Sequence, residues 1–361
     1  MKSPKIKTSL FFLCFIYLSC THAQIKSGAD FLDSLEPLQN AELIITPHQD
    51  HTELIQAFNL AKTSIYVGIF GITDLKIAEA LSAAQKRGVK VIVICDKACS
   101  DNPKRLAIFE GLKSAGVEIY TASTGFSISH WKMFVIDDSK AFISTMNFIV
   151  RTEQMRDLGV FLTNPTIVQE IIRVFKSDVE NAKNQTAITP TLNNSNLVWS
   201  PNNSEVKLTA LIGSAQKSIE IWIENMGNAA IHQALKAAVQ RGVKVRLLTS
   251  ECGMGMPAAA SFVNLKDLAE GKIDVHVMPF PASSMVPYIH AKSISIDRKT
   301  QFLGSENFSY NSLQKARELG IIFQDKTIEA RLNSEFESDW RSSISLPAQP
   351  PETCSPLTVA I

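Results

Sequence analysis

Two motifs of the form His-x-Lys followed by four residues and Asp are the part of this sequence best suited to chemistry. The first spans His130–Asp137 and the second spans His290–Asp297. Near pH 7 a neutral imidazole is a good nucleophile and an imidazolium is a good acid, while a lysine ammonium stabilises an anion beside it. One such match arises by chance often enough to mean little, but two matches in one chain indicate a shared site for an anion.

The geometry of a β-strand determines which residues of each motif can act together. Lys132–Ile136 (KMFVI) and Lys292–Ile296 (KSISI) have the apolar patterns of strands. Residues two apart on a strand project from the same face, so the His and the Lys of each motif point together. Asp137 and Asp297 stand seven residues after the His, so they project from the opposite face of the strand and lie roughly 23 Å from the His along it. We therefore expect both to be structural, ending the strand or pairing with a basic residue.

After each motif the chain is predicted to turn back as a hairpin. The turn-like sequences DSK and RKT follow the two strands, and the apolar runs AFIST and QFLGS return. Folding at these turns brings Asn147 level with Trp131 and Asn307 level with Ala291, within about one residue. Both asparagines thus return to the histidine end of their hairpin.

Hydroxyl groups accompany the asparagines, because Thr145 and Ser305 stand two residues earlier in the chain. We expect them to contribute hydroxyls. His, Lys and Asn from each hairpin then form a cationic, donor-rich cluster, and a phosphodiester is an anion that fits it. We predict no metal and no cofactor in this cluster. A lysine, which is not a metal ligand at neutral pH, occupies the place where a metal phosphodiesterase would carry a further His or Asp.

The elements that must position these motifs belong to an internal repeat. Thr63–Val91 aligns without gaps on Lys217–Val245, and 13 of the 29 positions are identical by direct count. An offset of 154 residues is too long for a solenoid repeat and fits duplication of a whole domain. Because a His-x-Lys motif follows each copy, the duplication favours one shared site over two unrelated structural histidines.

Each copy of the repeat reads as strand, helix, strand. The first strands are predicted at Ser64–Ile69 and Ser218–Ile223, and VKVIVIC and VKVRLLT form the second strands. Matching residues bound the helices between them: Asp74 and Asn228 as N-caps, and Gly88 and Gly242 as helix ends. Strands that alternate with helices predict an α/β fold with a largely parallel sheet covered by helices.

The sequence divides into four predicted segments. Residues 1–23 are a signal peptide, 24–190 the half with the first motif, 191–345 the half with the second motif, and 346–361 a flexible tail. The natural linker between the halves is the stretch rich in Asn, Ser and Pro near 189–203.

The N-terminus has the residue order of a signal peptide. Three lysines precede the apolar run Leu10–Leu18, which is too short to span a bilayer, and Thr21–Ala23 fits a cleavage site before Gln24. We therefore expect an exported protein, periplasmic or secreted, and a lipoprotein acylated at Cys20 is the alternative. An oxidising compartment permits disulfides among the four cysteines that remain, whose pairing the sequence leaves open. They are Cys95, Cys99, Cys252 and Cys354.

The paired motifs and their surroundings resemble the phospholipase D superfamily over most of the chain after residue 23. Besides the two HxKx4D motifs, the resemblance rests on Gly304-Ser305-x-Asn307 and on an acidic residue in each half, Asp157 in RDLG and Glu318 in RELG. The first copy departs from the family by carrying Ser144-Thr145 where the family has Gly-Ser, a change that keeps a hydroxyl.

This resemblance implies two α-β-α sandwich halves related by a pseudo-twofold axis, with one active site at their interface. In the family one His attacks phosphorus to form a phosphohistidine, the other protonates the leaving oxygen, and lysines and asparagines hold the non-bridging oxygens. We expect His130 to be the nucleophile and His290 the acid, although the symmetry of the sequence leaves this open. Asp157 and Glu318 resemble the family's acids that orient each histidine. The predicted catalytic residues are His130, Lys132, Asn147, His290, Lys292 and Asn307, and the supporting residues are Asp137, Thr145, Asp157, Asp297, Ser305 and Glu318.

The substrate is a separate question, because the superfamily includes lipid hydrolases, cardiolipin-forming transferases and nucleases. Without residues 1–23 the chain has 33 basic and 35 acidic residues, so it lacks the basic excess of most nucleic-acid-binding proteins. The loops at 253–262 and 278–290 are apolar, which suits acyl chains or a membrane surface. We expect a monomer that hydrolyses a phospholipid or transfers its phosphatidyl group, touches the membrane surface, and has no stable nucleic-acid partner. A metal-independent nuclease is the alternative.

Overall fold

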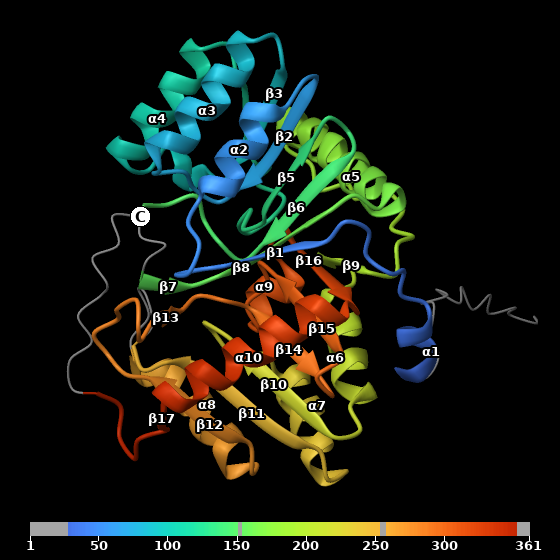
Figure 1. The fold of residues 1–361 in the computed structure, drawn as a ribbon, viewed down its shortest axis with the longest axis vertical. Helices are drawn as coiled ribbons and strands as arrows, with labels where there is room; N and C mark the ends of the chain where they lie inside the picture. Colours follow the sequence, from blue (N-terminus) through green and yellow to red (C-terminus); the bar gives the residue numbers. More distant parts are fainter. Residues whose placement is uncertain (1–27, 151–153, 253–257, 352–361) are drawn as a thin grey trace, which may run out of the picture.

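Two β-sheets, one from each half of the chain, form the framework of the computed structural model, which describes residues 28–150, 154–252 and 258–351. Figure 1 shows the first half, in blue to green, above the second half, in yellow to red. Helices cover both sheets, and this arrangement confirms the predicted α/β fold with two duplicated halves.

The first half contains a seven-stranded sheet in the order β1-β8-β6-β5-β2-β3-β4. Helices α2, α3 and α4 pack on one face of this sheet, and the long helix α5 packs on the other (Figure 1). The strands are β1 (Glu42–Ile45), β2 (Ser64–Ile69), β3 (Lys90–Cys95), β4 (Glu118–Thr121), β5 (Lys132–Ile136), β6 (Lys140–Ser144) and β8 (Leu158–Leu162). The helices are α2 (Thr52–Leu60), α3 (Leu75–Lys86), α4 (Pro103–Ser114) and α5 (Pro165–Asn184), with a short 3₁₀ helix at Lys97–Cys99.

The second half contains an eight-stranded sheet in the order β17-β12-β11-β10-β14-β15-β16-β9. Helices α6, α7 and α8 pack on one face and α10 on the other. The strands are β9 (Leu197–Ser200), β10 (Ser218–Trp222), β11 (Lys244–Ser250), β12 (Asp274–Met278), β14 (Ser293–Ile296), β15 (Thr300–Gly304), β16 (Glu318–Phe323) and β17 (Ile344–Ser345). The helices are α6 (Ser204–Ser214), α7 (Ala229–Gln240), α8 (Ala258–Glu270), α9 (Tyr310–Gln314) and α10 (Lys326–Ser342), and α1 (Gly28–Asp33) from the N-terminal segment packs against α6.

Both sheets are mixed, so the prediction of a largely parallel sheet was wrong. In each half the repeated strand-helix-strand unit gives parallel neighbours, β2 with β3 and β10 with β11. The hairpin that carries the His-x-Lys motif joins this unit in the antiparallel direction, through β5 beside β2 and β14 beside β10. A tight hairpin can only produce antiparallel strands, and its return strand pairs with further antiparallel neighbours.

The predicted helix boundaries of the repeat are confirmed. The side chain of Asp74 accepts from the backbone N–H of Lys76, and that of Asn228 accepts from Ile231, so both act as N-caps. Both repeat helices are followed by a glycine with a left-handed backbone, with φ of 91° at Gly88 and 89° at Gly242. A residue without Cβ adopts this conformation without strain.

The hairpins are shorter than predicted, which shifts their register. Ile136 pairs with Lys140, so that Trp131 would face Thr145 rather than Asn147; the second hairpin shows the same two-residue shift. The cause is the turn: Asp137 and Asp138 are both left-handed, with φ of 51° and 52°, and reverse the chain directly after the strand.

Asp137 and Asp297 hold the loop before the first strand of their repeat. Oδ1 of Asp137 accepts from the backbone N–H of Thr63 at 2.7 Å and of Ser64 at 3.1 Å. Asp297 accepts in the same way from the backbone of Lys217 at 2.7 Å. The role is structural, as expected, but among the described residues the partners are backbone N–H groups and the hydroxyl of Thr63, and not basic side chains.

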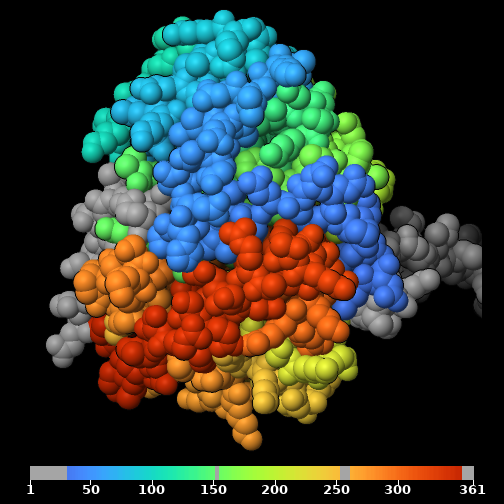
Figure 2. All heavy atoms as spheres, viewed as in Figure 1, coloured from blue at the N-terminus to red at the C-terminus, as the bar shows by residue number. Residues whose placement is uncertain are grey.

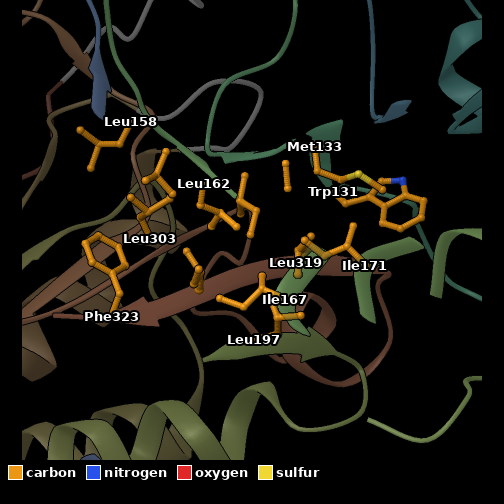
Figure 3. Packing of buried hydrophobic residues seen from close by; sticks show 14 of the residues in the cluster. Trp131, Met133, Leu158, Leu162, Ile167, Ile171, Leu197, Leu303, Leu319 and Phe323 are labelled. Carbon is orange, nitrogen blue, oxygen red and sulfur yellow. The ribbon is translucent and has the colours of Figure 1, made fainter. Parts of the chain in front are cut away.

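A continuous hydrophobic core joins the two halves. Figure 3 shows residues of the first half, such as Met133 and Ile171, packed in one cluster with Leu303, Leu319 and Phe323 of the second half. In Figure 2 the blue N-terminal segment lies against the red C-terminal segment. The halves therefore hold one another in a fixed relation, which a site shared between them requires.

The repeats exchange large and small residues beside their motifs. A Cβ added to Gly68 would lie 2.6 Å from the ring of Trp131, so only glycine fits there. In the second repeat Trp222 stands at the position of Gly68, and Ala291 stands at the position of Trp131. Both tryptophans are buried, which keeps the volume beside each motif filled.

The predicted linker and the start of the predicted tail both contact the second half. The predicted linker at 189–203 contains strand β9, which pairs with β16, and α1 packs against α6 of the second half. The predicted tail begins with Leu346, whose N–H donates to the carbonyl of Val275. Residues 1–23 and 352–361 lie outside the described residues. No described helix is both long and apolar enough to cross a bilayer.

Candidate active site

The two motif histidines are each fixed by the backbone of the opposite repeat. The N–H groups of His130 and Trp131, just before β5, donate to the carbonyl of Arg317 at 2.9 and 3.2 Å. The N–H groups of His290 and its neighbour Ala291, just before β14, donate to the carbonyl of Arg156. Arg156 lies in the short strand β7 (Met155–Arg156), which pairs with β13 (Tyr288–Ile289) at the boundary of the halves (Figure 1).

The imidazole rings are oriented by carboxylates that also come from the opposite repeat. Nδ1 of His130 bonds Oε2 of Glu318 at 2.9 Å, and Nδ1 of His290 bonds Oδ1 of Asp157 at 2.6 Å. A carboxylate can only accept, so Nδ1 carries the proton in both rings. Nε2 of each ring is therefore the nitrogen available for chemistry. The two residues predicted to orient the histidines do contact them, each across the interface.

A further layer of hydroxyls holds the two carboxylates. Oγ1 of Thr145 donates to Asp157 at 2.5 Å, and Oγ of Ser312 donates to Glu318 at 2.5 Å. The hydroxyl of Ser305 instead contacts the backbone of Leu319. The expected hydroxyls of Thr145 and Ser305 thus bond within the protein, and that of Thr145 supports the site through Asp157.

Two buried arginines hold the same segments through ion pairs between the repeats. Nε of Arg156 donates to Asp339 on α10 at 2.8 Å, and Arg317 donates to Asp178 on α5 at 2.8 Å. Each arginine and its aspartate come from different repeats. The sequence carries the signal, since an Arg precedes the acid in both RDLG and RELG, but the partners are too distant in the chain to be predicted.

The motif lysines are buried and point back to their histidines. Nζ of Lys132 donates to the carbonyl of His130 at 2.6 Å, and Nζ of Lys292 donates to that of His290 at 2.5 Å. Burial lowers the pKa of Lys132 to about 7, against the opposing charge of Glu318. This ammonium therefore lacks full compensation and is suited to bind an anion.

Charged groups from both repeats act on His130. Burial lowers the pKa of His130, and the charges of Lys132 and of Lys292 from the other repeat lower it further, against the charge of Glu318. Neutral imidazole is thus favoured at His130.

The two asparagines have different surroundings. Nδ2 of Asn307 donates to Glu224 at 3.2 Å, and its Oδ1 accepts from the N–H of Asn225. It therefore lies at the end of the hairpin that carries His290, as expected. Asn147 is buried, and its Oδ1 has no hydrogen-bond partner among the described residues. This oxygen can accept a hydrogen bond from a ligand but cannot donate one.

The sequence interpretation missed Glu224, which directly contacts the second motif. Oε2 of Glu224 accepts a hydrogen bond from Nζ of Lys292 at 2.7 Å and lies 3.8 Å from Nε2 of His290. Burial pushes the pKa of Glu224 up, but the charges of Lys292 and His290 outweigh it, and the pKa lies well below its ordinary value. The available signal was an acidic residue directly after an apolar strand.

Glu306 is a second acid that the sequence interpretation missed. It is fully buried, and neither of its side-chain oxygens has a hydrogen-bond partner among the described residues. Burial, reinforced by the charge of Glu318, raises its pKa well above the usual value. Burial therefore favours the protonated, uncharged form of Glu306.

Comparisons with known proteins agree with this geometry. The family described as cardiolipin synthase, PLD-like domain, matches residues 54–179 and again residues 208–340. Phospholipase D Z of Dictyostelium discoideum is 26% identical over 87% of this chain and 89% of its own length. The probable cardiolipin synthase YwiE of Bacillus subtilis (strain 168) is 25% identical over 85% of this chain and 67% of its own. The solved structure of phosphatidylserine synthase from Haemophilus influenzae Rd KW20 has a TM-score of 0.68 and 15% identity, over 88% of this chain and 91% of that one, which is a likeness of fold.

Proposed function

The chain belongs to the family described as cardiolipin synthase, PLD-like domain, and from that premise we propose that it cleaves the headgroup ester of phospholipids, or passes the phosphatidyl group to an alcohol. The observation that carries the proposal is the pair of crossed bonds that hold His130 on Glu318 and His290 on Asp157. Two imidazoles with fixed Nδ1 protons and available Nε2 atoms can attack a phosphodiester and protonate its leaving group in one site.

We assign the attack on phosphorus to His130. Its lowered pKa favours the neutral ring, and its side chain is 15% exposed while that of His290 is only 3% exposed. Nε2 of His130 forms the bond to phosphorus as the bond from phosphorus to the headgroup oxygen breaks. The product of this step is a phosphohistidine on His130.

His290 is assigned the proton transfers. In this assignment His290 starts as the imidazolium, and two carboxylates lie beside its ring: Asp157 at 2.6 Å from Nδ1 and Glu224 at 3.8 Å from Nε2. It gives the Nε2 proton to the headgroup oxygen. It then takes a proton from the water or alcohol that attacks the phosphohistidine, and His130 is released as a neutral ring.

The remaining polar groups bind the two non-bridging phosphate oxygens. Lys132 and Lys292 supply ammonium groups, and the Nδ2 groups of Asn147 and Asn307 supply N–H donors. Charge on these oxygens increases as the nucleophile arrives, so donors fixed in a buried site stabilise the transition state more than the substrate.

A phospholipid is favoured as substrate by the apolar surface beside the second motif. Phe280 and Met285 lie in the loop that leads to Tyr288 and His290, and their exposed fractions are 37% and 82%. Val263 on α8 is exposed as well. Large apolar side chains that face water suit contact with a membrane surface.

We also propose that residues 1–23 direct export and that the exported protein acts as a monomer. Cys252 is disulfide-bonded, which supports an oxidising compartment. The monomer is supported by the site itself, because one chain supplies both histidines and both orienting acids. N-terminal sequencing of the mature protein and its mass in solution test these two points.

To test the activity, the purified protein is incubated with labelled phosphatidylcholine and ethanol, and separately with plasmid and single-stranded DNA. All reactions contain EDTA. Formation of phosphatidylethanol and phosphatidic acid is expected, and EDTA should not reduce it. DNA nicking without lipid turnover would overturn the lipid proposal in favour of a nuclease. Loss of turnover in EDTA would contradict the metal-free mechanism.

A further inference from the structure

The two ends of the site differ in one pair of matching residues. Phe70 follows β2 in the first repeat, and Glu224 follows β10 at the corresponding position of the second. The ring of Phe70 meets the ring of His130 edge-on, with centroids 5.3 Å apart. At His290 the same place is taken by a carboxylate. At this position the site therefore has an aromatic ring beside its proposed nucleophile and a carboxylate beside its proposed acid.

Glu224 is held in place by three side chains. Lys292 and Asn307 both donate to Oε2, at 2.7 and 3.2 Å, and the hydroxyl of Tyr288 donates to Oε1 at 3.2 Å. Each carboxylate oxygen can accept about two hydrogen bonds, so Oε1 can still accept a further donor. Because its pKa is well below the ordinary value, Glu224 carries its charge throughout the neutral range.

The carboxylate can also be reached from outside. The side chain of Glu224 is 15% exposed, while those of Lys292 and His290 are 0% and 3% exposed. Glu224 is therefore more accessible than the histidine and lysine beside it. Among the described residues, the ammonium that bonds Glu224 is that of Lys292, which is also assigned to the phosphate.

We propose that Glu224, positioned by Tyr288, is an ammonium subsite that selects phospholipids whose headgroup carries an amino group two carbons from the ester oxygen. The proposal rests on the proposed function, in which His290 protonates that oxygen. Ordinary bond lengths place such a nitrogen roughly 3–4 Å from the oxygen. With the oxygen at hydrogen-bond distance from Nε2 of His290, the ammonium reaches Glu224, which lies 3.8 Å from the same Nε2.

Charge balance explains why the amine is needed. When the phosphate arrives, Lys292 bonds its oxygens and gives up part of its interaction with Glu224. A headgroup ammonium then replaces the lost partner, so that one internal ion pair becomes two pairs with a zwitterionic substrate. A glycerol or ethanol headgroup offers no cation and leaves a half-desolvated carboxylate without compensation.

The experiment compares headgroup release from vesicles of phosphatidylethanolamine, phosphatidylglycerol and phosphatidylethanol by the full chain and by Glu224→Gln. The native protein should have a kcat/KM at least tenfold higher for phosphatidylethanolamine than for the other two lipids. Glu224→Gln should lower the value for phosphatidylethanolamine at least tenfold and bring the ratio close to one. Glu251→Gln is the matched control, since Glu251 is a nearby acid whose Oε2 accepts from the backbone of Phe280, and it should leave the ratio unchanged.

The possible results separate the subsite from the proposed function. Equal losses on all three lipids in Glu224→Gln, or a native preference for phosphatidylglycerol, would overturn the subsite while leaving the lipid activity standing. Absence of lipid turnover, in protein that still cleaves bis(p-nitrophenyl) phosphate, would overturn the proposed function and the subsite with it. If Glu224→Gln does not fold, Tyr288→Phe replaces it, with an expected two- to fivefold fall in the ratio; an unchanged ratio would count against the subsite.

Discussion

Glu318 of the second repeat accepts a hydrogen bond of 2.9 Å from Nδ1 of His130 in the first repeat, and the backbone carbonyl of the preceding residue, Arg317, accepts from the N–H of the same histidine. Two neighbouring residues of one half thus fix both the backbone and the ring of a histidine in the other. Asp157 and Arg156 do the same for His290. Neither histidine can be positioned without the opposite repeat, so the duplication is part of the chemistry as well as of the fold.

The roles of the two histidines are tested with a phosphatidyl p-nitrophenyl ester, whose leaving group departs without protonation. His290→Ala should release about one equivalent of p-nitrophenol per protein and then turn over at least 10²–10⁴-fold more slowly, because its phosphohistidine lacks a base for hydrolysis. Intact mass should show the phosphatidyl group on this variant. His130→Ala should give no burst. A burst in His130→Ala alone would reverse the assignment, and unchanged circular dichroism of both variants is the control.

The hydroxyl of Thr145 should matter through Asp157, which it holds at 2.5 Å. Thr145→Val keeps the shape and removes the donor, so the carboxylate that orients His290 becomes less fixed. We expect kcat to fall about tenfold with little change in KM, a size typical of support for a catalytic group. Thr145→Ser retains the hydroxyl and should restore kcat to within about twofold. Equal kcat in the two variants would show that the hydroxyl has no part in positioning.

The sequence was sufficient for those parts of the site that depend on local periodicity. His130 stands two residues before Lys132, where β5 begins, and His290 and Lys292 come just before β14, so strand geometry was enough to predict that each His and its Lys act together. The hairpin register did not follow, because it depends on two successive left-handed residues, Asp137 and Asp138. Aspartate tolerates that conformation but does not demand it, whereas a glycine would have signalled it.

The remaining features were hidden because they break the symmetry between the repeats or bridge them. Glu224 and Glu306 align with Phe70 and Met146, so a search for matched polar residues passes over both acids. The crossed bond from Asp157 to His290 spans 133 residues. Its direction depends on how the two sheets stack, which a pairing of motifs within each half cannot reveal.

The pH dependence of kcat/KM should show an optimum below pH 7. His130 must be neutral to attack, and its pKa is lowered from 6.5. The loss of activity on the acid side should therefore occur below pH 6.5. Lys132 must be charged to hold the phosphate, and burial lowers its pKa to about 7. The ammonium is lost as the pH rises through 7, and kcat/KM, which reports the free enzyme, should fall about tenfold per unit above it. A rate that stays level up to pH 9 would contradict this role for Lys132.

Asp137→Ala should reduce stability and leave the chemistry intact. The substitution removes the acceptor for the backbone N–H groups of Thr63 and Ser64, and alanine is strained at a φ of 51°. We expect a loss of about 1–3 kcal/mol in urea unfolding, with kcat per folded molecule unchanged. Asp137→Asn tolerates the left-handed backbone and keeps one acceptor oxygen, so it should lose less. A fall in kcat without a change in unfolding midpoint would assign Asp137 to the chemistry instead.

Glu306→Met should stabilise the protein increasingly as the pH rises. Met146 occupies the matching position of the first repeat, is also fully buried, and shows that a side chain of this shape fits. Because burial raises the pKa of Glu306, the folded state keeps a proton that the unfolded chain releases above its ordinary pKa of about 4.3. Folded Glu306 therefore costs stability as the pH increases toward its raised pKa, by up to about 1.4 kcal/mol per unit. Melting temperatures of both proteins at pH 5 and pH 8 measure this: the variant should gain relative to the native protein at pH 8, and a difference that does not change with pH would mean that Glu306 is not protonated in the folded state.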